Sequence, residues 1–186
     1  MTIFLLSYLV ASPTSSGAFS PTFSSSSQYA AANVIHRTLN SSNPKEEEYF
    51  GSSVAVSGNI VVVGGSPFSG RNHSSLVYVF SAATGNLIET LASPDTYSNF
   101  GESVAASGRI VVVGAPGEEA GGHYAAGHAY IFNVLTGRLI HTLTSPNAQK
   151  VGVFGSSVSV SGNIVVVGAP GETVNGYFAA GHAYIF

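Results

Sequence analysis

The sequence contains no cysteine and no tryptophan, and only 8% of its residues are charged. Without cysteine the chain can form neither a disulfide framework nor a thiolate zinc site, and it has no cysteine nucleophile. Its six lysines and arginines do not cluster, so it lacks the basic surface with which nucleic-acid-binding proteins displace counterions from phosphates. We therefore expect no nucleic-acid partner.

The low charge does not indicate disorder. Hydrophobic residues make up 45% of the 186-residue chain, and this fraction can bury enough apolar surface to offset the entropy lost on ordering. The chain has the length of one domain of ordinary size. We expect a folded protein.

One continuous apolar run lies at the N-terminus, at Ile3–Ala11 (IFLLSYLVA). A membrane-spanning helix needs about 20 apolar residues, so this run is too short to span a bilayer. It fits the apolar region of a signal peptide, with a small-residue cleavage site at Ser16–Ala18, although no lysine or arginine precedes it. We expect residues 1–28 to form a signal peptide and a Ser-rich lead, no transmembrane segment, and an extracellular or cell-surface location. The alternatives are an irregular N-terminus and a first strand without special role.

The remaining chain repeats itself three times. The repeats open at Phe50-Gly51, Phe100-Gly101 and Phe154-Gly155 and read FGSSVAVSGNIVVVGGSP, FGESVAASGRIVVVGAPGE and FGSSVSVSGNIVVVGAPGE. Their openings lie 50 and 54 residues apart, which is in the range of propeller blades and kelch-like repeats.

Each repeat predicts four short strands. In the first repeat these are about Ser52–Val56, Ile60–Val63, Val77–Phe80 and Leu87–Leu91. The Gly58-Asn59 pair favours a tight hairpin turn, and the second strand is apolar on both faces, as in a strand covered by neighbouring sheets. No stretch has a helical period. The predicted fold is all-β, with four-stranded antiparallel blades.

The long loops of each repeat share one side of the blade. The connection between the second and third strands and the connection to the next repeat are long, whereas the other two turns are tight. Binding residues tend to lie in loops on a rigid scaffold. The candidate binding-face residues are therefore Glu118, Glu119, His123, Tyr124, Glu172 and Tyr177.

The spacing from FG to GAP, at Phe100/Gly114–Pro116 and Phe154/Gly168–Pro170, resembles the FG-GAP repeat. This is the repeat of the integrin α-subunit propeller and of many microbial surface proteins. The first repeat departs from it, with Gly64–Pro67 (GGSP) in place of GAP. The resemblance implies a β-propeller, commonly of seven blades, that serves adhesion or contacts with proteins and glycans.

The calcium sites of the resembled family do not carry over. There they are Asp-rich loops between the first two strands, whereas this chain has one aspartate, Asp95. Calcium prefers several carboxylate oxygens. Metal binding by His123 and His128 is disfavoured, since Tyr177 and Leu76 replace them in other repeats, and a structural role is favoured. We expect no metal and no cofactor.

The strands of the repeat domain, residues 29–186, do not complete a ring. Before Phe50, the stretch VIHRTLNSSNP resembles the fourth-strand stretch LIHTLTSPN, which predicts a fourth strand at 33–41, blades at 50–92 and 100–145, and a partial blade at 154–186. This is about three blades, below the four to eight of known propellers. The chain is part of a longer protein with further blades, which we favour, or pairs as a homodimer, or stays open with exposed edges.

Three classes of function fit this reading. We favour a binding or adhesion module without catalytic activity, whose partner is a protein or a glycan. Glu118, Glu119 and Glu172 could carry acid–base chemistry as in a hydrolase, but solvated loop acids are the more common reading and no nucleophile can be named. The stretch AYIFNVLTGRLIHTL resembles quinoprotein repeats, yet the tryptophan that those repeats use is absent. A purely structural repeat is the third possibility.

Overall fold

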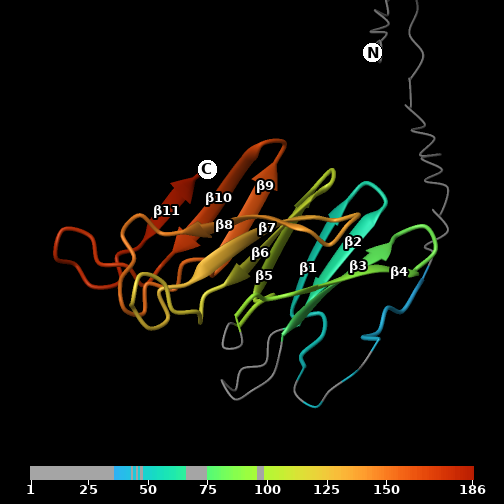
Figure 1. Cartoon of the computed structure of the whole chain (residues 1–186), viewed down its shortest axis with the longest axis horizontal. Coiled ribbons are helices and arrows are strands. Elements are labelled where there is room, and N and C mark those ends of the chain that lie inside the picture. The colour runs from blue at the N-terminus through green and yellow to red at the C-terminus, as the bar shows by residue number, and fades with distance from the viewer. Residues whose placement is uncertain (1–35, 43, 45, 47, 66–74, 96–98) are drawn as a thin grey trace, which may run out of the picture. The chain divides into compact units, whose positions relative to one another are not determined.

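The computed structural model describes residues 36–42, 44, 46, 48–65, 75–95 and 99–186. These residues form three antiparallel β-sheets, shown in Figure 1, and the predicted all-β fold of open propeller blades is confirmed. Within these ranges the chain forms no helix, and hence none that could cross a membrane. The predicted leader, residues 1–28, lies outside the described residues.

Each repeat forms one sheet in which strands that follow one another along the chain are hydrogen-bonded neighbours. The first two sheets have four strands, in the orders β1-β2-β3-β4 and β5-β6-β7-β8, and the third has three, in the order β11-β10-β9. The strands are β1 (Ser53–Ser57), β2 (Ile60–Gly64), β3 (Leu76–Ser81), β4 (Leu87–Ala92), β5 (Ser103–Ser107), β6 (Ile110–Ala115), β7 (His128–Asn133), β8 (Leu139–Thr144), β9 (Ser157–Ser161), β10 (Ile164–Ala169) and β11 (His182–Ile185).

The predicted fourth strand at 33–41 does not appear as a strand over its described part. Arg37–Ser41 lies outside every sheet. A fourth strand forms by hydrogen bonding to a third strand, and the described residues hold no third strand on that side of it.

The FG and GAP sequences are joined through their glycines. The Gly101 N–H donates to the Gly114 carbonyl (3.0 Å), and Gly155 bonds Gly168 in the same way (3.0 Å). Gly155 has φ +95° and approaches the neighbouring sheet so closely that a Cβ atom would lie 2.3 Å from the carbonyl oxygen of His128. Only glycine fits both the conformation and the space, which explains why this residue opens the repeat.

The phenylalanine of each FG pair packs on two aromatic side chains that lie in, or directly after, the third strand of its own sheet. Phe100 lies 5.9 Å from both the Tyr130 and the Phe132 ring centroids, and Phe154 packs likewise on Tyr184 and Phe186. Such tilted and edge-to-face pairs are favourable geometries for aromatic rings. Because Phe100 and Phe154 are fully buried, they fix the start of each repeat against its own blade.

Successive sheets pack face to face through two apolar cores. The first core joins the first and second sheets, and its buried members include Val62, Val79, Val111 and Phe132. The second core joins the second and third sheets, with Val112 and Val167 at its centre. The middle strands are apolar on both faces because both faces are covered, as the sequence predicted.

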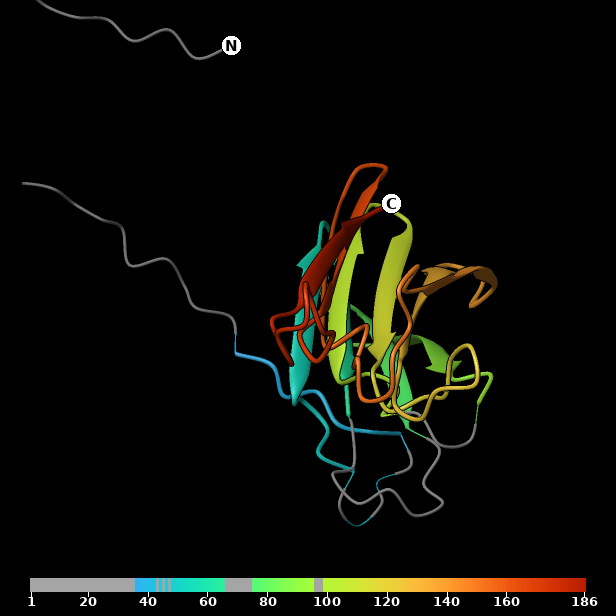
Figure 2. The same cartoon turned by 90° about the vertical axis from the view of Figure 1, so that its left-hand side faces the viewer.

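The first strands of the three sheets lie side by side, with β5 between β1 and β9. Serines on these strands bridge the sheets: Ser53 Oγ donates to the Gly101 carbonyl (2.6 Å), and Ser103 Oγ donates to the Gly155 carbonyl (2.7 Å). Figures 1 and 2 show that β4 and β8, at the other edge of their sheets, are rotated away from the direction of the first strands. This is the usual twist of a β-sheet.

Candidate functional site

Two glutamates lie fully buried beneath the long loops. Glu118 and Glu172 each have 0% of their surface exposed. Each follows a GAP sequence, and the turn after the strand folds the chain inward, since the Glu172 N–H donates to the Ala169 carbonyl (3.3 Å). The Gly181 N–H then donates to the Glu172 carbonyl (2.9 Å) and closes the loop. The glutamate is therefore held at both ends of its backbone.

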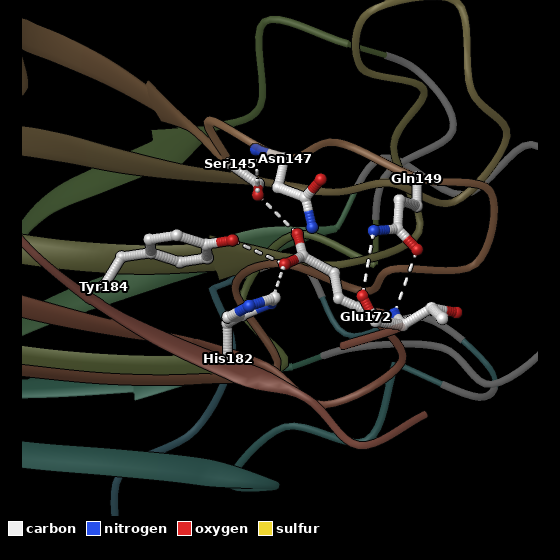
Figure 3. A network of polar contacts seen from close by, with 7 residues as sticks. Ser145, Asn147, Gln149, Glu172, His182 and Tyr184 are labelled. Carbon is white, nitrogen blue, oxygen red and sulfur yellow. Dashed lines mark hydrogen bonds and ion pairs between the residues drawn. The ribbon is translucent and has the colours of Figure 1, made fainter. Parts of the chain in front are cut away.

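The carboxylate of Glu172 is surrounded by polar groups from two sheets (Figure 3). The Tyr184 hydroxyl donates to Oε2 (2.6 Å), and His182 Nδ1 lies 2.7 Å from the same oxygen. The Ser145 hydroxyl donates to Oε1. Ser145 follows β8 of the second sheet, whereas the other groups belong to the third, so the carboxylate joins the end of one sheet to the next.

The side-chain amide of Gln149 also binds this loop, at the residue that follows Glu172. The Thr173 N–H donates to Gln149 Oε1 (2.9 Å), and Gln149 Nε2 donates back to the Thr173 carbonyl (3.4 Å). Both bonds are visible in Figure 3. Gln149 belongs to the connection between the second and third sheets, which is thus tied to the loop beside Glu172.

Glu118 has the same surroundings in the second sheet. Ser93 Oγ donates to its Oε1 (2.7 Å) and Tyr130 to its Oε2 (2.5 Å). His128 Nδ1 lies 2.9 Å from Oε2, but off the direction of a hydrogen bond. His128 thus lies against the carboxylate without a hydrogen bond to it. We name this repeated arrangement of serine, glutamate and tyrosine the carboxylate tie.

The first sheet obtains its carboxylate from a different part of the sequence. The Tyr78 hydroxyl donates to Glu48 Oε1 (2.6 Å), and Ser41 Oγ donates to the same oxygen (3.0 Å). Glu48 precedes Phe50, whereas Glu118 and Glu172 follow GAP. The tie is therefore present three times, although only two of its glutamates occupy matching places in the repeat.

The carboxylate ties change the ionisation of their tyrosines. Burial raises the pKa of the Tyr130 hydroxyl, and its hydrogen bond to Glu118 raises it further. Burial and then the hydrogen bond to Glu172 raise the pKa of Tyr184, and Tyr78 shows the same direction beside Glu48. The hydroxyls consequently stay protonated and remain hydrogen-bond donors to the carboxylates at neutral pH.

The predicted binding-face residues divide into two groups. Glu119, His123, Tyr124 and Tyr177 are exposed. Glu118 and Glu172 are not, so the expectation that they are solvated loop acids was wrong. Their partners reach them from the preceding sheet, at Ser93 and Ser145, and a single repeat does not show these contacts. The structural role favoured for His128 agrees with its position beside Glu118.

Sequence reasoning did not identify the serines or tyrosines of the ties. A signal was present, because SPD and SPN follow the fourth strands and HAY opens the third strand of two repeats. Glu48 carried no such signal. Within the described ranges, no group of three or more histidine, aspartate or glutamate side chains could hold a metal ion.

Comparison with known protein families identifies the repeat. The profile of the FG-GAP repeat matches residues 37–80, 92–132 and 139–186, which together make up most of the chain. A search of curated proteins found no significant match.

Proposed function

Because the chain belongs to the FG-GAP repeat family, we propose that it is a binding module without catalytic activity, exported or displayed at a cell surface. FG-GAP repeats are typical of extracellular and surface proteins, and they form propeller-type domains that commonly serve adhesion. The partner binds at the tips of the loops after GAP, and aromatic side chains make the contact.

The observation that carries the proposal is a set of exposed aromatic side chains at these tips. Tyr124, Tyr177 and Phe178 have 69%, 74% and 83% of their surface exposed. Tyr124 and Phe178 occupy matching places in the second and third repeats. Exposed aromatic rings provide large contact areas at little entropic cost, and they are enriched at protein interfaces.

The aromatic residues stand on loops with a fixed backbone. Ala120 pairs with His123, and Val174 pairs with Tyr177, as isolated β-bridges. The Val151 N–H donates to the Tyr124 carbonyl (2.8 Å), so the connection to the third sheet supports this tip. A preorganised loop loses little entropy on binding, which favours recognition.

The carboxylate ties support a role without catalysis. The acids that sequence reasoning considered for acid–base chemistry include Glu118 and Glu172, which are fully buried and surrounded by hydroxyl donors. A general acid or base must come within hydrogen-bond reach of a substrate proton. A buried carboxylate that joins two sheets is better suited to holding blades together.

The test is a binding screen with the full chain and two variants. The probes are a glycan array and a panel of immobilised extracellular matrix proteins. Replacing both loop aromatics (Tyr124→Ala with Phe178→Ala) should weaken any captured interaction by about tenfold or more, because a buried aromatic anchor commonly contributes about 2 kcal/mol. Leu135→Ala is the matched control, since Leu135 is also exposed but lies in the turn between β7 and β8.

The outcomes separate the classes of function. Binding to a matrix protein that is lost in the double variant and kept in Leu135→Ala supports the proposal, and binding to a glycan would assign the other class of partner. Binding that survives the double variant would refute the assigned loop tips. Absence of binding to either panel would favour a purely structural repeat. Detecting the chain in the medium of expressing cells tests its export.

A further inference from the structure

The third sheet has an uncovered apolar face. Ile164 and Ile185 are 57% and 76% exposed. Their counterparts in the first sheet are Ile60, which packs against the first core, and Val79, which is fully buried. In the first and second sheets this face meets the next blade. The third sheet therefore exposes the face that packs against another blade in the first two sheets.

On the first sheet the opposite face is uncovered at β1, whereas its two middle strands are buried in a third apolar cluster. Val54 and Val56 on β1 are 66% and 68% exposed. The matching residues of β9, Val158 and Val160, pack against the second core, which joins the third sheet to the second. The exposed face of β1 is thus the one that meets a preceding blade elsewhere in the chain.

The segment Arg37–Ser41 lies in the place of a preceding blade's fourth strand. Arg37 lies beside Gly85 in the turn between β3 and β4, as Glu89 of β4 lies beside Gly137 in the next sheet. Ser41 bonds Glu48, as Ser93 after β4 bonds Glu118. Arg37–Ser41 thus takes the position of a fourth strand beside the first sheet, although it is not hydrogen-bonded within a sheet.

The third sheet has no fourth strand in the described part of the chain. β3 and β7 are each paired with a fourth strand, whereas β11 is paired on one side alone in the described part of the chain. Such an unpaired strand edge is a template for strand addition. In the described part of the chain, β11 therefore has a free edge on the side where β3 and β7 pair with a fourth strand, and Arg37–Ser41 lies outside every sheet.

The serine contacts between sheets are also ready to continue. Ser157 lies beside Gly168 as Ser103 lies beside Gly114, and Ser103 Oγ donates to the carbonyl of the next FG glycine (2.7 Å). The Gly162 N–H donates to Ser107 Oγ of the preceding sheet (3.1 Å). By the same register, Ser157 would donate to a Gly51 carbonyl, and Ser161 would accept from a Gly58 N–H.

We propose that the occupant of both faces is a second copy of this chain. The sheet β9–β11 of each copy packs against β1–β4 of the other, and Arg37–Ser41 of one copy pairs with β11 of its partner as a fourth strand. The contact is head-to-tail, and two such contacts related by a twofold axis close a ring. Six blades result, which is within the range of about four to eight seen in propellers.

The test measures the mass of the full chain by light scattering during size exclusion. We expect the mass of two copies. Ile185→Asp places a charge on the face of the third sheet, and Val54→Asp places one on the face of the first. Each should lower the mass about twofold, since a buried unpaired charge opposes docking. Leu135→Asp, an exposed substitution outside both faces, should leave the mass unchanged.

Mixing the two variants distinguishes this arrangement from other dimers. Each variant keeps one intact face, so an equimolar mixture should regain a species of two copies through a single contact. If Ile185→Asp dissociates the dimer and Val54→Asp does not, the contact joins like faces and the proposal is overturned. A wild-type mass of one copy, or a series of larger masses, overturns the closed ring as well.

Hydrogen exchange provides a readout that does not depend on the variants. The β11 amides should exchange slowly at concentrations where two copies associate, and about tenfold faster or more on dilution to the dissociated state, because strand pairing protects amides. Circular dichroism of each variant confirms that its sheets are intact. Equal exchange of β11 at both concentrations would contradict pairing with a second copy.

Discussion

The first and third sheets build the same blade from different surroundings. Both have a carboxylate tie to a tyrosine of the third strand, but the first takes its carboxylate from Glu48 ahead of FG, and the third takes it from Glu172 after GAP. Both begin with a glycine of φ near +95°, yet Gly155 touches a neighbouring sheet and Gly51 has open space around its Cα. The first and third blades thus have the same geometry, although residues at different places in the repeat make the corresponding contacts.

The largest expected effect separates the two glycines. Gly155→Ala should destabilise the fold by about 3–5 kcal/mol, because the added methyl group meets the His128 carbonyl in a backbone conformation that is already unfavourable for alanine. Gly51→Ala has the same unfavourable φ without the clash and should cost about 1–2 kcal/mol. Urea unfolding of both variants measures the difference. Equal losses would mean that neighbour contact does not select glycine at Gly155.

The second prediction compares the two carboxylates. Glu172→Ala should lower the free energy of unfolding by about 2–3 kcal/mol, since it removes a fully buried carboxylate and leaves the buried Ser145 hydroxyl and the half-buried Tyr184 hydroxyl without their acceptor. Glu48→Ala should cost about 1 kcal/mol, because Glu48 is partly exposed and water can replace it.

Thermal or urea unfolding tests this order. Glu172→Gln keeps one acceptor oxygen and serves as the conservative control, with a loss between those of the wild type and Glu172→Ala. A cost for Glu48→Ala that equals or exceeds that of Glu172→Ala would contradict the assigned difference in burial.

The smallest predicted effect is a loss of stability in alkali. Tyrosine has an ordinary pKa of about 10, and the folded chain raises the pKa of Tyr184 and Tyr78. Above about pH 10 the unfolded chain loses these protons first, so the folded state binds more protons and the free energy of unfolding falls as the pH rises. Below that pH the contribution is fully present.

Urea midpoints between about pH 8 and about pH 11 measure this slope. Tyr184→Phe and Tyr78→Phe should each make the alkaline decline shallower, because each removes one titrating hydroxyl of the ties. A decline that is unchanged in both variants would assign the alkaline sensitivity to other groups.

The fold could be predicted from the sequence because its strands and turns depend on local residue patterns that recur in each repeat. The predicted strand Ile60–Val63 differs from the observed β2 by one residue, and the Gly58 turn occurs as expected with φ +57°. Alternating apolar residues and glycines at turns depend on contacts within a blade. The same three repeats supply these contacts three times, so the pattern is hard to mistake.

The carboxylate ties could not be predicted because their partners lie in different sheets. Ser145 and Glu172 are 27 residues apart and belong to successive blades, and nothing in either stretch alone shows that they meet. Glu172 therefore resembled a surface acid. Glu48 is harder still, since it fills the role from a place where the other repeats have no matching acid. The exposure of Tyr124 and Tyr177 could be predicted, because it follows from their position in the loops alone.

The bridges from Ser53 and Ser103 to glycine carbonyls have a consequence for how such chains diversify. A serine that binds a main-chain oxygen recognises no particular side chain in its neighbour, so this contact can form between any two units of the kind. Duplication or deletion of a whole unit leaves this serine–glycine contact unaltered. Gene-level recombination can then lengthen or shorten the array, while the loop tips change sequence without disturbing how the units join.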